Sequence, residues 1–206
     1  MVDPDLIFPA TAMPDRDWWQ ELWPEPEETL RKIGIKDHMT VVDLCSGDGY
    51  FTAPLAKIVK GNLFAVDLDP NMLDQTREAL NQQGATVRDL ILADARDVAN
   101  IIPEKADYVL IANTFHGIPD KTSIVEAVAK VLKPGGKLGI VNWYPATRED
   151  TQVLGKPRGP KTELRMSPET VQRIVERAGF RLASLVELPP FHYGIVFEKA
   201  GQSNHR

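Results

Sequence analysis

The chain has 206 residues, of which 43% are hydrophobic and 26% charged, and its formal net charge at pH 7 is −5. This size suits one folded domain, and no apolar stretch reaches the length of a membrane-spanning helix. The acidic balance disfavours non-specific attraction to nucleic acid or anionic lipid. The N-terminal decapeptide lacks the pattern of a signal or transit peptide. A single cysteine, Cys45, excludes an internal disulfide, so we expect a cytoplasmic protein.

The N-terminal part of the chain is predicted to be helical. Trp18, Trp19 and Trp23 lie at helical spacing, and a second short helix is expected over residues 25–33, ending at Gly34. The three indoles are consistent with two interpretations. They form the buried face of an amphipathic helix, an aromatic lid over a substrate, or both.

From residue 40 onwards, predicted strands alternate with predicted helices. The strands are rich in Val, Ile and Leu, which indicates a parallel sheet covered on both faces. The predicted strands are 40–44, 62–68, 86–94, 106–114 and 137–143. The predicted helices are 50–61, 70–84, 95–102 and 120–132, and a Lys-Pro-Gly-Gly turn follows the last of them.

The C-terminal part ends in a predicted hairpin. A helix over residues 167–180 begins with Ser167 as its cap and Pro168 at its first position. Strands 181–188 and 192–200 are separated only by Pro-Pro-Phe, which is too short for a parallel crossover. We therefore predict an α/β fold, a Rossmann-like doubly wound seven-stranded sheet with six parallel strands, the last strand antiparallel and helices on both faces. The final three residues are expected to be frayed.

The turn after the first strand indicates a ligand of positive charge. The strand ends at Asp43, and a small-residue loop with Gly47 and Gly49 leads into the next helix. A dinucleotide would place its pyrophosphate here, where Asp43 and Asp48 would repel it, and Thr52 replaces the third glycine of that pattern. A nucleoside without phosphate that brings positive charge fits better. S-adenosylmethionine, with its α-ammonium and sulfonium, is such a ligand.

Two further carboxylates end the next two strands. Asp67 follows Gly47 by twenty residues, the spacing at which a carboxylate accepts the hydroxyls of a ribose. Asp94 is placed to accept the amino group of an adenine, although an ordinary helix N-cap explains it as well. Asp69 competes for the ribose, but its place before Pro70 suits a helix start better.

Residues 40–143 resemble the class I S-adenosylmethionine-dependent methyltransferases, especially the small quinone-biosynthesis-like enzymes. The resemblance rests on VVDLCSGDG, FAVDLDPNML, ADAR, NTFHGIPD and LKPGGKLGI, in this order at successive strand ends. It implies that Asp43 acts on the cofactor's amino group directly or through water, that Asp67 binds ribose, and that Asp94 and Ala95 border adenine. Cys45 replaces the usual first glycine of the loop and removes no ligand. The cofactor-binding residues expected on this basis are Asp43, Ser46, Gly47, Gly49, Tyr50, Asp67, Leu68, Asp94, Ala95, Asn113 and Phe115.

The resemblance also divides the chain into four parts. We expect a single methyltransferase domain over 1–206, with an N-terminal helical cap (1–36), a cofactor-binding core (37–143), an inserted lid-like loop (144–166) and a C-terminal helix with its hairpin (167–200). The candidate substrate-binding residues are Trp18, Trp19, Trp23, Tyr144 and Arg165.

Several side chains are open to more than one interpretation. His116 is a candidate general base, or it caps the next turn and shapes the pocket. The cations of the insert are either a solvated run or a lid for an anionic substrate; they are Lys156, Arg158, Lys161 and Arg165. His192 and Tyr193 are expected to pack in the sheet, Asp48 to be solvated and Cys45 to be a small buried residue. Without a second cysteine we expect no metal site.

The sequence thus predicts methyl transfer from S-adenosylmethionine to a small molecule by in-line displacement, catalysed mainly by positioning and desolvation. We expect a small-molecule substrate, no nucleic acid and no membrane span, and a homodimer stays open. A nicotinamide-dependent oxidoreductase on the same fold and a non-catalytic S-adenosylmethionine-binding protein are the alternatives. The acceptor is not defined, although the basic insert favours an acidic or phenolic one.

Overall fold

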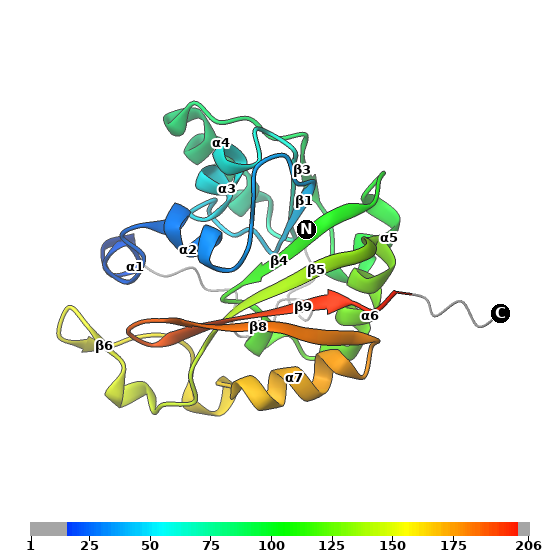
Figure 1. Ribbon diagram of the computed structural model, residues 1–206. Coiled ribbons are helices and arrows are strands. Elements are labelled where there is room, and N and C mark those ends of the chain that lie inside the picture. Colours follow the sequence, from blue (N-terminus) through cyan, green and yellow to red (C-terminus); the bar gives the residue numbers. More distant parts are fainter. Residues whose placement is uncertain (1–15, 202–206) are drawn as a thin grey trace.

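The computed structural model describes residues 16–201, so the expectations for the N-terminal decapeptide and the last three residues lie outside it. A twisted seven-stranded sheet forms the centre of the described part, with helices on both of its faces (Figure 1). Within this part no helix combines the length and the apolar character that crossing a membrane would require.

The sheet has the predicted topology. Its strands are β1 (Val41–Leu44), β2 (Leu63–Asp67), β3 (Asp89–Leu92), β4 (Ala106–Ala112), β5 (Leu132–Trp143), β8 (Phe180–Leu188) and β9 (His192–Lys199), in the order β3-β2-β1-β4-β5-β9-β8. The pairs from β3 to β5 are parallel, and β9 is antiparallel to both β5 and β8. Because β8 therefore runs with the parallel strands, the prediction of six parallel strands and one antiparallel strand is confirmed.

Two hydrophobic cores lie on opposite faces of the sheet. Val41 faces one core and Val42 the other, because successive side chains of a strand point to opposite faces. One core contains helices α1 (Arg16–Leu22), α2 (Pro26–Lys32), α3 (Thr52–Ile58) and α4 (Pro70–Gln83), and the other contains α5 (Val98–Ile101), α6 (Lys121–Val131) and α7 (Pro168–Glu176). Burial on both faces explains why the central strands are apolar without alternation.

The predicted helix starts are made by local capping. Asp69 accepts a hydrogen bond from the amide of Asn71 at 2.8 Å, which makes it the N-cap of α4, with Pro70 at the first helical position. Ser167 caps α7 in the same way through the amide of Thr170. Asp69 is thus used as a helix start, as its neighbour Pro70 indicated.

Two strands differ most in length from their predictions. β5 begins at Leu132 instead of residue 137, because Leu132 pairs with Ala106 before the chain makes its turn at Gly135 (φ +74°). β3 spans only Asp89–Leu92, the four residues that pair with Phe64–Asp67 of β2.

The insert over residues 144–166 is folded against itself. It contains 3₁₀ turns at Arg148–Asp150 and Thr162–Leu164 and a small hairpin of β6 (Gln152–Val153) and β7 (Lys156–Pro157). Arg165 is buried and donates to the carbonyls of Ala146 and Arg158 and to the hydroxyl of Thr151. One arginine therefore ties both ends of the insert to its middle.

Candidate functional site

A cavity of about 1040 Å³ opens at the carboxyl ends of the parallel strands. It lies where β1 has β2 on one side and β4 on the other, the switch point at which open α/β sheets bind ligands. Its walls come from α1, from the loops after β1 to β4 and from the insert. Pockets for single ligands range up to about 1000 Å³, so this cavity is large enough for a cofactor and an acceptor together.

Asp43 is a buried carboxylate at the cavity wall. Burial raises its pKa to about 7, and the nearby Asp67 adds to the effect. Thr52 Oγ1 donates a hydrogen bond of 2.7 Å to one carboxylate oxygen, which opposes part of this shift. Thr52, which replaces the third glycine of the dinucleotide pattern, therefore stabilises the carboxylate of Asp43. Desolvation of an anion is costly unless a partner compensates, so this position favours a cationic ligand group.

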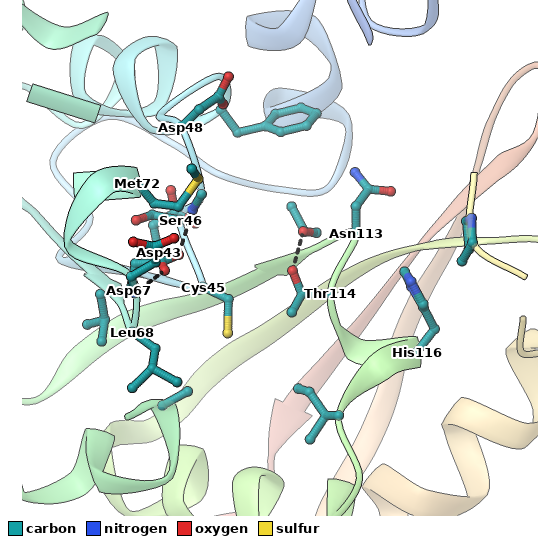
Figure 2. A pocket seen from close by; sticks show the side chains of 18 of the residues that line it. Asp43, Cys45, Ser46, Asp48, Asp67, Leu68, Met72, Asn113, Thr114 and His116 are labelled. Carbon is teal, nitrogen blue, oxygen red and sulfur yellow. Dashed lines mark hydrogen bonds between the residues drawn. The ribbon is translucent and has the colours of Figure 1, made fainter. Parts of the chain in front are cut away.

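Asp67 joins the loops that follow β1 and β2. Its Oδ2 accepts the amide of Gly47 at 2.8 Å, and its Oδ1 accepts the amide of Asp69 at 3.0 Å. Desolvation raises the pKa of this carboxyl despite both hydrogen bonds. Figure 2 shows Asp43 and Asp67 close together on one side of the pocket, with Asn113 and His116 on the other. The carboxylates and β4's exit thus enclose a space from two sides.

Four residues on the wall carry a buried polar atom that has no hydrogen-bond partner within the described residues. These atoms are the hydroxyl of Ser46, both the oxygen and the nitrogen of the Asn113 amide, Nε1 of Trp19 and Nε of Arg158. Asn113 also adopts a left-handed backbone conformation, with φ at +57°. Leaving a buried polar group unpaired costs about 1–3 kcal/mol, so such groups mark places where a ligand completes the hydrogen bonding.

Asp94 acts as a cap and as an ion-pair partner. It accepts the amide of Arg96 at 2.8 Å, and the guanidinium of Arg96 donates to both of its oxygens at 2.9 and 3.0 Å. These bonds to Arg96 hold the pKa of Asp94 below its usual value. The N-cap interpretation is confirmed, and the carboxylate lines the cavity with Ala95 beside it.

The expectation that Asp48 is solvated is wrong. Its side chain is buried because the turn places it beneath the N-terminal helices, where it accepts the amide of Tyr50 at 3.0 Å and pairs with Arg16 at 3.3 Å. The hydroxyl of Tyr50 in turn donates to the carbonyl of Trp23 at 2.5 Å. The predicted cofactor loop is therefore fastened to the N-terminal helical segment.

His116 belongs to a buried hydrogen-bond chain that crosses the sheet edge. Tyr193 donates its hydroxyl proton to the carbonyl of Met166 at 2.8 Å, so it accepts from the amide nitrogen of Asn142 at 3.4 Å. The amide oxygen of Asn142 then faces His116 Nδ1 at 2.9 Å. We assign the proton to Nδ1 from this polarity, which leaves Nε2 unprotonated. Burial lowers the pKa of His116 to about 4, so the ring is neutral at pH 7.

His192 and Tyr193 pack in the sheet, as expected. The imidazole of His192 is buried between the rings of Trp23 and Trp143, at centroid distances of 4.5 and 4.1 Å. Tyr193 packs at 5.0 Å from the ring of Tyr144.

Most predicted site residues lie on the cavity wall. They are Trp18, Trp19, Asp43, Ser46, Gly47, Tyr50, Asp67, Leu68, Asp94, Ala95, Asn113 and His116. Cys45 also lies there and is only partly buried, so the expectation of a buried residue is wrong, because its side chain borders the cavity. Desolvation together with nearby carboxylates raises the pKa of its thiol, so it stays protonated at pH 7. Among residues 16–201 no group of three His, Cys, Asp or Glu side chains is arranged to hold a metal ion.

Five predicted residues do not line the cavity, and each has a structural reason. Phe115 is fully buried in the core beneath the fourth strand's exit, and Gly49 packs against α4. Arg165 donates its hydrogen bonds to groups within the insert. The ring of Trp23 packs against His192, and the ring of Tyr144 packs against Tyr193. The predicted ligand contacts of these five have no support in the geometry; they are Gly49, Phe115, Trp23, Tyr144 and Arg165.

Other wall residues escaped sequence reasoning. Met72 and Asn71 stand on the first turn of α4, Ile118 follows His116, and Arg148 comes from the insert. The only feature of the sequence that could have identified these residues is their position next to the loops predicted to bind ligands. Arg158 and Lys161, considered as lid cations, also line the cavity.

The comparisons with known proteins agree with this geometry. Residues 41–136 match the family described as "Methyltransferase domain". The Ubiquinone/menaquinone biosynthesis C-methyltransferase UbiE of Shewanella sediminis is 33% identical over 118 residues, which cover 56% of this chain and 47% of that protein. An uncharacterized methyltransferase of Mycobacterium tuberculosis is 35% identical over 143 residues, which cover 65% of this chain and 55% of that protein.

A solved structure has the same fold. The structure of a SAM-dependent methyltransferase from Aquifex aeolicus superimposes with a TM-score of 0.73 at 24% identity, covering 92% of this chain and 100% of that one. The chain spans about half the length of the curated relatives it matches.

Proposed function

We propose that this chain is a class I S-adenosylmethionine-dependent methyltransferase that uses S-adenosylmethionine as its cofactor and transfers the methyl group to a small-molecule acceptor; the match of residues 41–136 to the methyltransferase domain and the similarity to the Shewanella and Aquifex proteins support this. The observation that carries the proposal is one cavity with buried Asp43 and the unpaired hydroxyl of Ser46 on one side and the unpaired amide of Asn113 on the other (Figure 2). The amino-acid part of S-adenosylmethionine has an ammonium group that could pair with Asp43, and polar atoms that could form hydrogen bonds with Ser46 and Asn113.

The residues present fit each part of the cofactor. Asp43 would hold the α-ammonium group, and Ser46 and Asn113 would pair with the polar atoms of the methionine end. Asp67 would accept the ribose hydroxyls, since each of its oxygens keeps a lone pair beyond the backbone bond. Leu68 and Ala95 would border the adenine, with Asp94 as the acceptor for its amino group.

Bound S-adenosylmethionine supplies a methyl group activated by a sulfonium, so the protein contributes alignment and exclusion of water. Trp18 and Trp19 form an apolar wall, and both are less than a tenth exposed. Holding two reactants in line contributes about 7–11 kcal/mol to lowering a barrier. Removing water favours the dispersed charge of the transition state over the concentrated charge of the sulfonium.

His116 would take a proton where the acceptor must lose one. Its neutral ring, with Nδ1 bound to Asn142, leaves Nε2 free to accept the proton of a phenol or other weakly acidic group. An acceptor that arrives ionised, such as a thiolate, needs no base.

The test has two arms. Calorimetric titration should give saturable binding of S-adenosylmethionine, whereas fluorescence titration with reduced nicotinamide cofactor should give none. A coupled assay for S-adenosylhomocysteine release should then find turnover in a panel of thiols, phenols, quinols and carboxylic acids; the name of the Shewanella relative justifies the quinols. Binding of the nicotinamide instead would overturn the proposal. Binding of S-adenosylmethionine with no release across the panel would reduce it to a binding function.

A further inference from the structure

We infer that the acceptor is a flat apolar molecule bearing an oxyanion, bound by the cationic cluster of Arg148, Arg158 and Lys161; this inference rests on the proposed function. All three residues belong to the insert and line the cavity. The charges of the cavity are divided by origin. Carboxylates come from β1 and β2 and from the loops after β1 to β4, where Asp94 is paired with Arg96, and the cationic cluster comes from the insert, where an acceptor would lie.

The cationic cluster has no acidic partner among residues 16–201. No carboxylate oxygen lies within 4.0 Å of its side-chain nitrogens, whereas Arg96 on the cavity wall is paired with Asp94, and Arg16 on α1 is paired with Asp48. Burial lowers the pKa of Arg165, and the nearby charge of Arg148 adds to this effect, while Glu149 opposes it. Gathering like charges is unfavourable, and an anion in the cavity would relieve it.

Arg158 gives a second, independent sign of a missing partner. Its Nε is buried and has no hydrogen-bond partner within the described chain. Its guanidinium lies 5.3 Å from the ring centre of Trp18, so a cation–π contact holds the group at the aromatic wall. A guanidinium presents planar donors that match the two oxygens of a carboxylate or phosphate.

The cluster is attached to a fixed part of the insert. Arg148 Nε donates to the carbonyl of Gly159 at 3.0 Å. Gly159 lies so close to the indole of Trp143 that an added Cβ would stand 2.7 Å from Cη2. The insert therefore packs against the ring of Trp143, which itself lines the cavity with Trp18 and Trp19. Cations on a wall of indoles suit an acceptor whose body is aromatic and whose edge is anionic.

The experiment measures acceptor binding without requiring turnover. Protein saturated with S-adenosylhomocysteine is titrated with 4-hydroxybenzoate, with 4-hydroxybenzamide as its neutral counterpart, and with phenyl phosphate, by calorimetry and tryptophan fluorescence. The acid should bind at least tenfold more tightly than the amide. The tighter of the two anions identifies carboxylate or phosphate as the recognised group.

Variants then locate the interaction. Arg158→Gln and Lys161→Gln should each weaken binding of the anion about tenfold and leave binding of the amide unchanged. Arg173→Gln removes the same charge from an exposed position on α7 and should change neither. S-adenosylhomocysteine should bind all variants equally, which also shows that they fold.

Equal affinity for acid and amide, no measurable binding of either anion, or an unaltered anion affinity in Arg158→Gln would overturn the inference while leaving the proposed function intact. Failure of the wild-type protein to bind S-adenosylmethionine or S-adenosylhomocysteine would overturn the proposed function itself. The two failures are therefore distinguishable.

Discussion

Asp67 and Gly47 stand twenty residues apart and are joined by a hydrogen bond of 2.8 Å from the glycine amide to the carboxylate. The residue proposed to bind ribose therefore also fixes the loop that carries Ser46 and Asp48. The spacing that identified Asp67 in the sequence thus has a structural cause, because it brings the two strand ends into contact.

Replacing Asp67 with Asn should weaken cofactor binding. The amide keeps the shape but loses the charge, and its NH₂ group faces a backbone donor. A hydrogen bond to a charged group is worth about 1.5–3 kcal/mol, which corresponds to a rise of about 10- to 100-fold in the dissociation constant of S-adenosylmethionine. Titration calorimetry measures it. Asp74→Asn, an exposed change on α4, is the control, and a change of less than twofold at Asp67 would contradict the ribose assignment.

Replacing Asp43 with Asn should stabilise the empty protein and weaken binding. The pKa is raised from 3.8 to about 7 by burial, so the folded state holds its proton more tightly and stability is lost as the pH rises through this window. The difference of about three units between the pKa of Asp43 in the unfolded and in the folded protein lowers the free energy of unfolding by at most about 4 kcal/mol at pH 8.

Chemical denaturation at pH 5 and pH 8 checks this prediction. The wild type should lose stability between the two, and the variant should lose much less. The same variant should bind S-adenosylmethionine less well at pH 8. Equal losses of stability in both proteins would show that Asp43 is not titrating in this range.

His116 should matter for some acceptors only. His116→Gln is expected to slow methylation of a phenol by less than the about 10²- to 10⁴-fold that a general base usually contributes, because a pKa of about 4 makes the ring a weak base, and to spare a thiolate. Because the pKa of His116 is near 4, the wild-type rate should not fall from protonation of this ring between pH 8 and pH 6, and it should fall near pH 4. Pre-steady-state rates with both acceptors measure this. Equal loss with phenol and thiolate would assign His116 a structural role.

Gly49 should tolerate no side chain. Its φ is +84°, and an added Cβ would stand 2.7 Å from the Cα of Thr76 on α4. Gly49→Ala should therefore cost more than the roughly 1–2 kcal/mol of a left-handed alanine and should also weaken cofactor binding by displacing the loop. Gly84→Ala, at φ +60° with open space around it, supplies the control. Urea denaturation measures the loss of unfolding free energy in both variants. Equal losses would mean that α4 moves away from the added methyl group, which would contradict the prediction.

Arg165→Met should loosen the insert and leave the sheet intact. The guanidinium holds the segment closed, so its loss should open residues 144–166 to protease while the cleaved fragments stay associated. Limited proteolysis with mass spectrometry reads the site of cleavage, and Arg173→Met is the matched control. Cleavage unchanged from the wild type would contradict this role.

The sequence was informative where neighbours in the chain decide the structure. Asp43, Asp67 and Asp69 sit at strand and helix ends whose hydrophobic patterns are local, and the topology follows from short connections. The burial of Asp48 could not be foreseen because it depends on Arg16, from a separate helix. The role of Asn142 was equally hidden, since it pairs with His116 across two strands.

The inserted segment shows the same limit. Its four cations, Lys156, Arg158, Lys161 and Arg165, are equivalent as judged from sequence alone. Packing sends Arg165 inward to its own backbone and leaves Arg158 at the cavity, because only Arg165 reaches the carbonyls of Ala146 and Pro160. No local pattern encodes that choice.

The hydroxyl of Tyr50, on the loop after β1, is joined to the carbonyl of Trp23 at the end of the N-terminal helical segment. A displacement of that loop is therefore transmitted to the segment that carries Trp18 and Trp19, two rings of the cavity wall. Filling the proposed cofactor site would thus also fix the aromatic wall against which the proposed acceptor would lie.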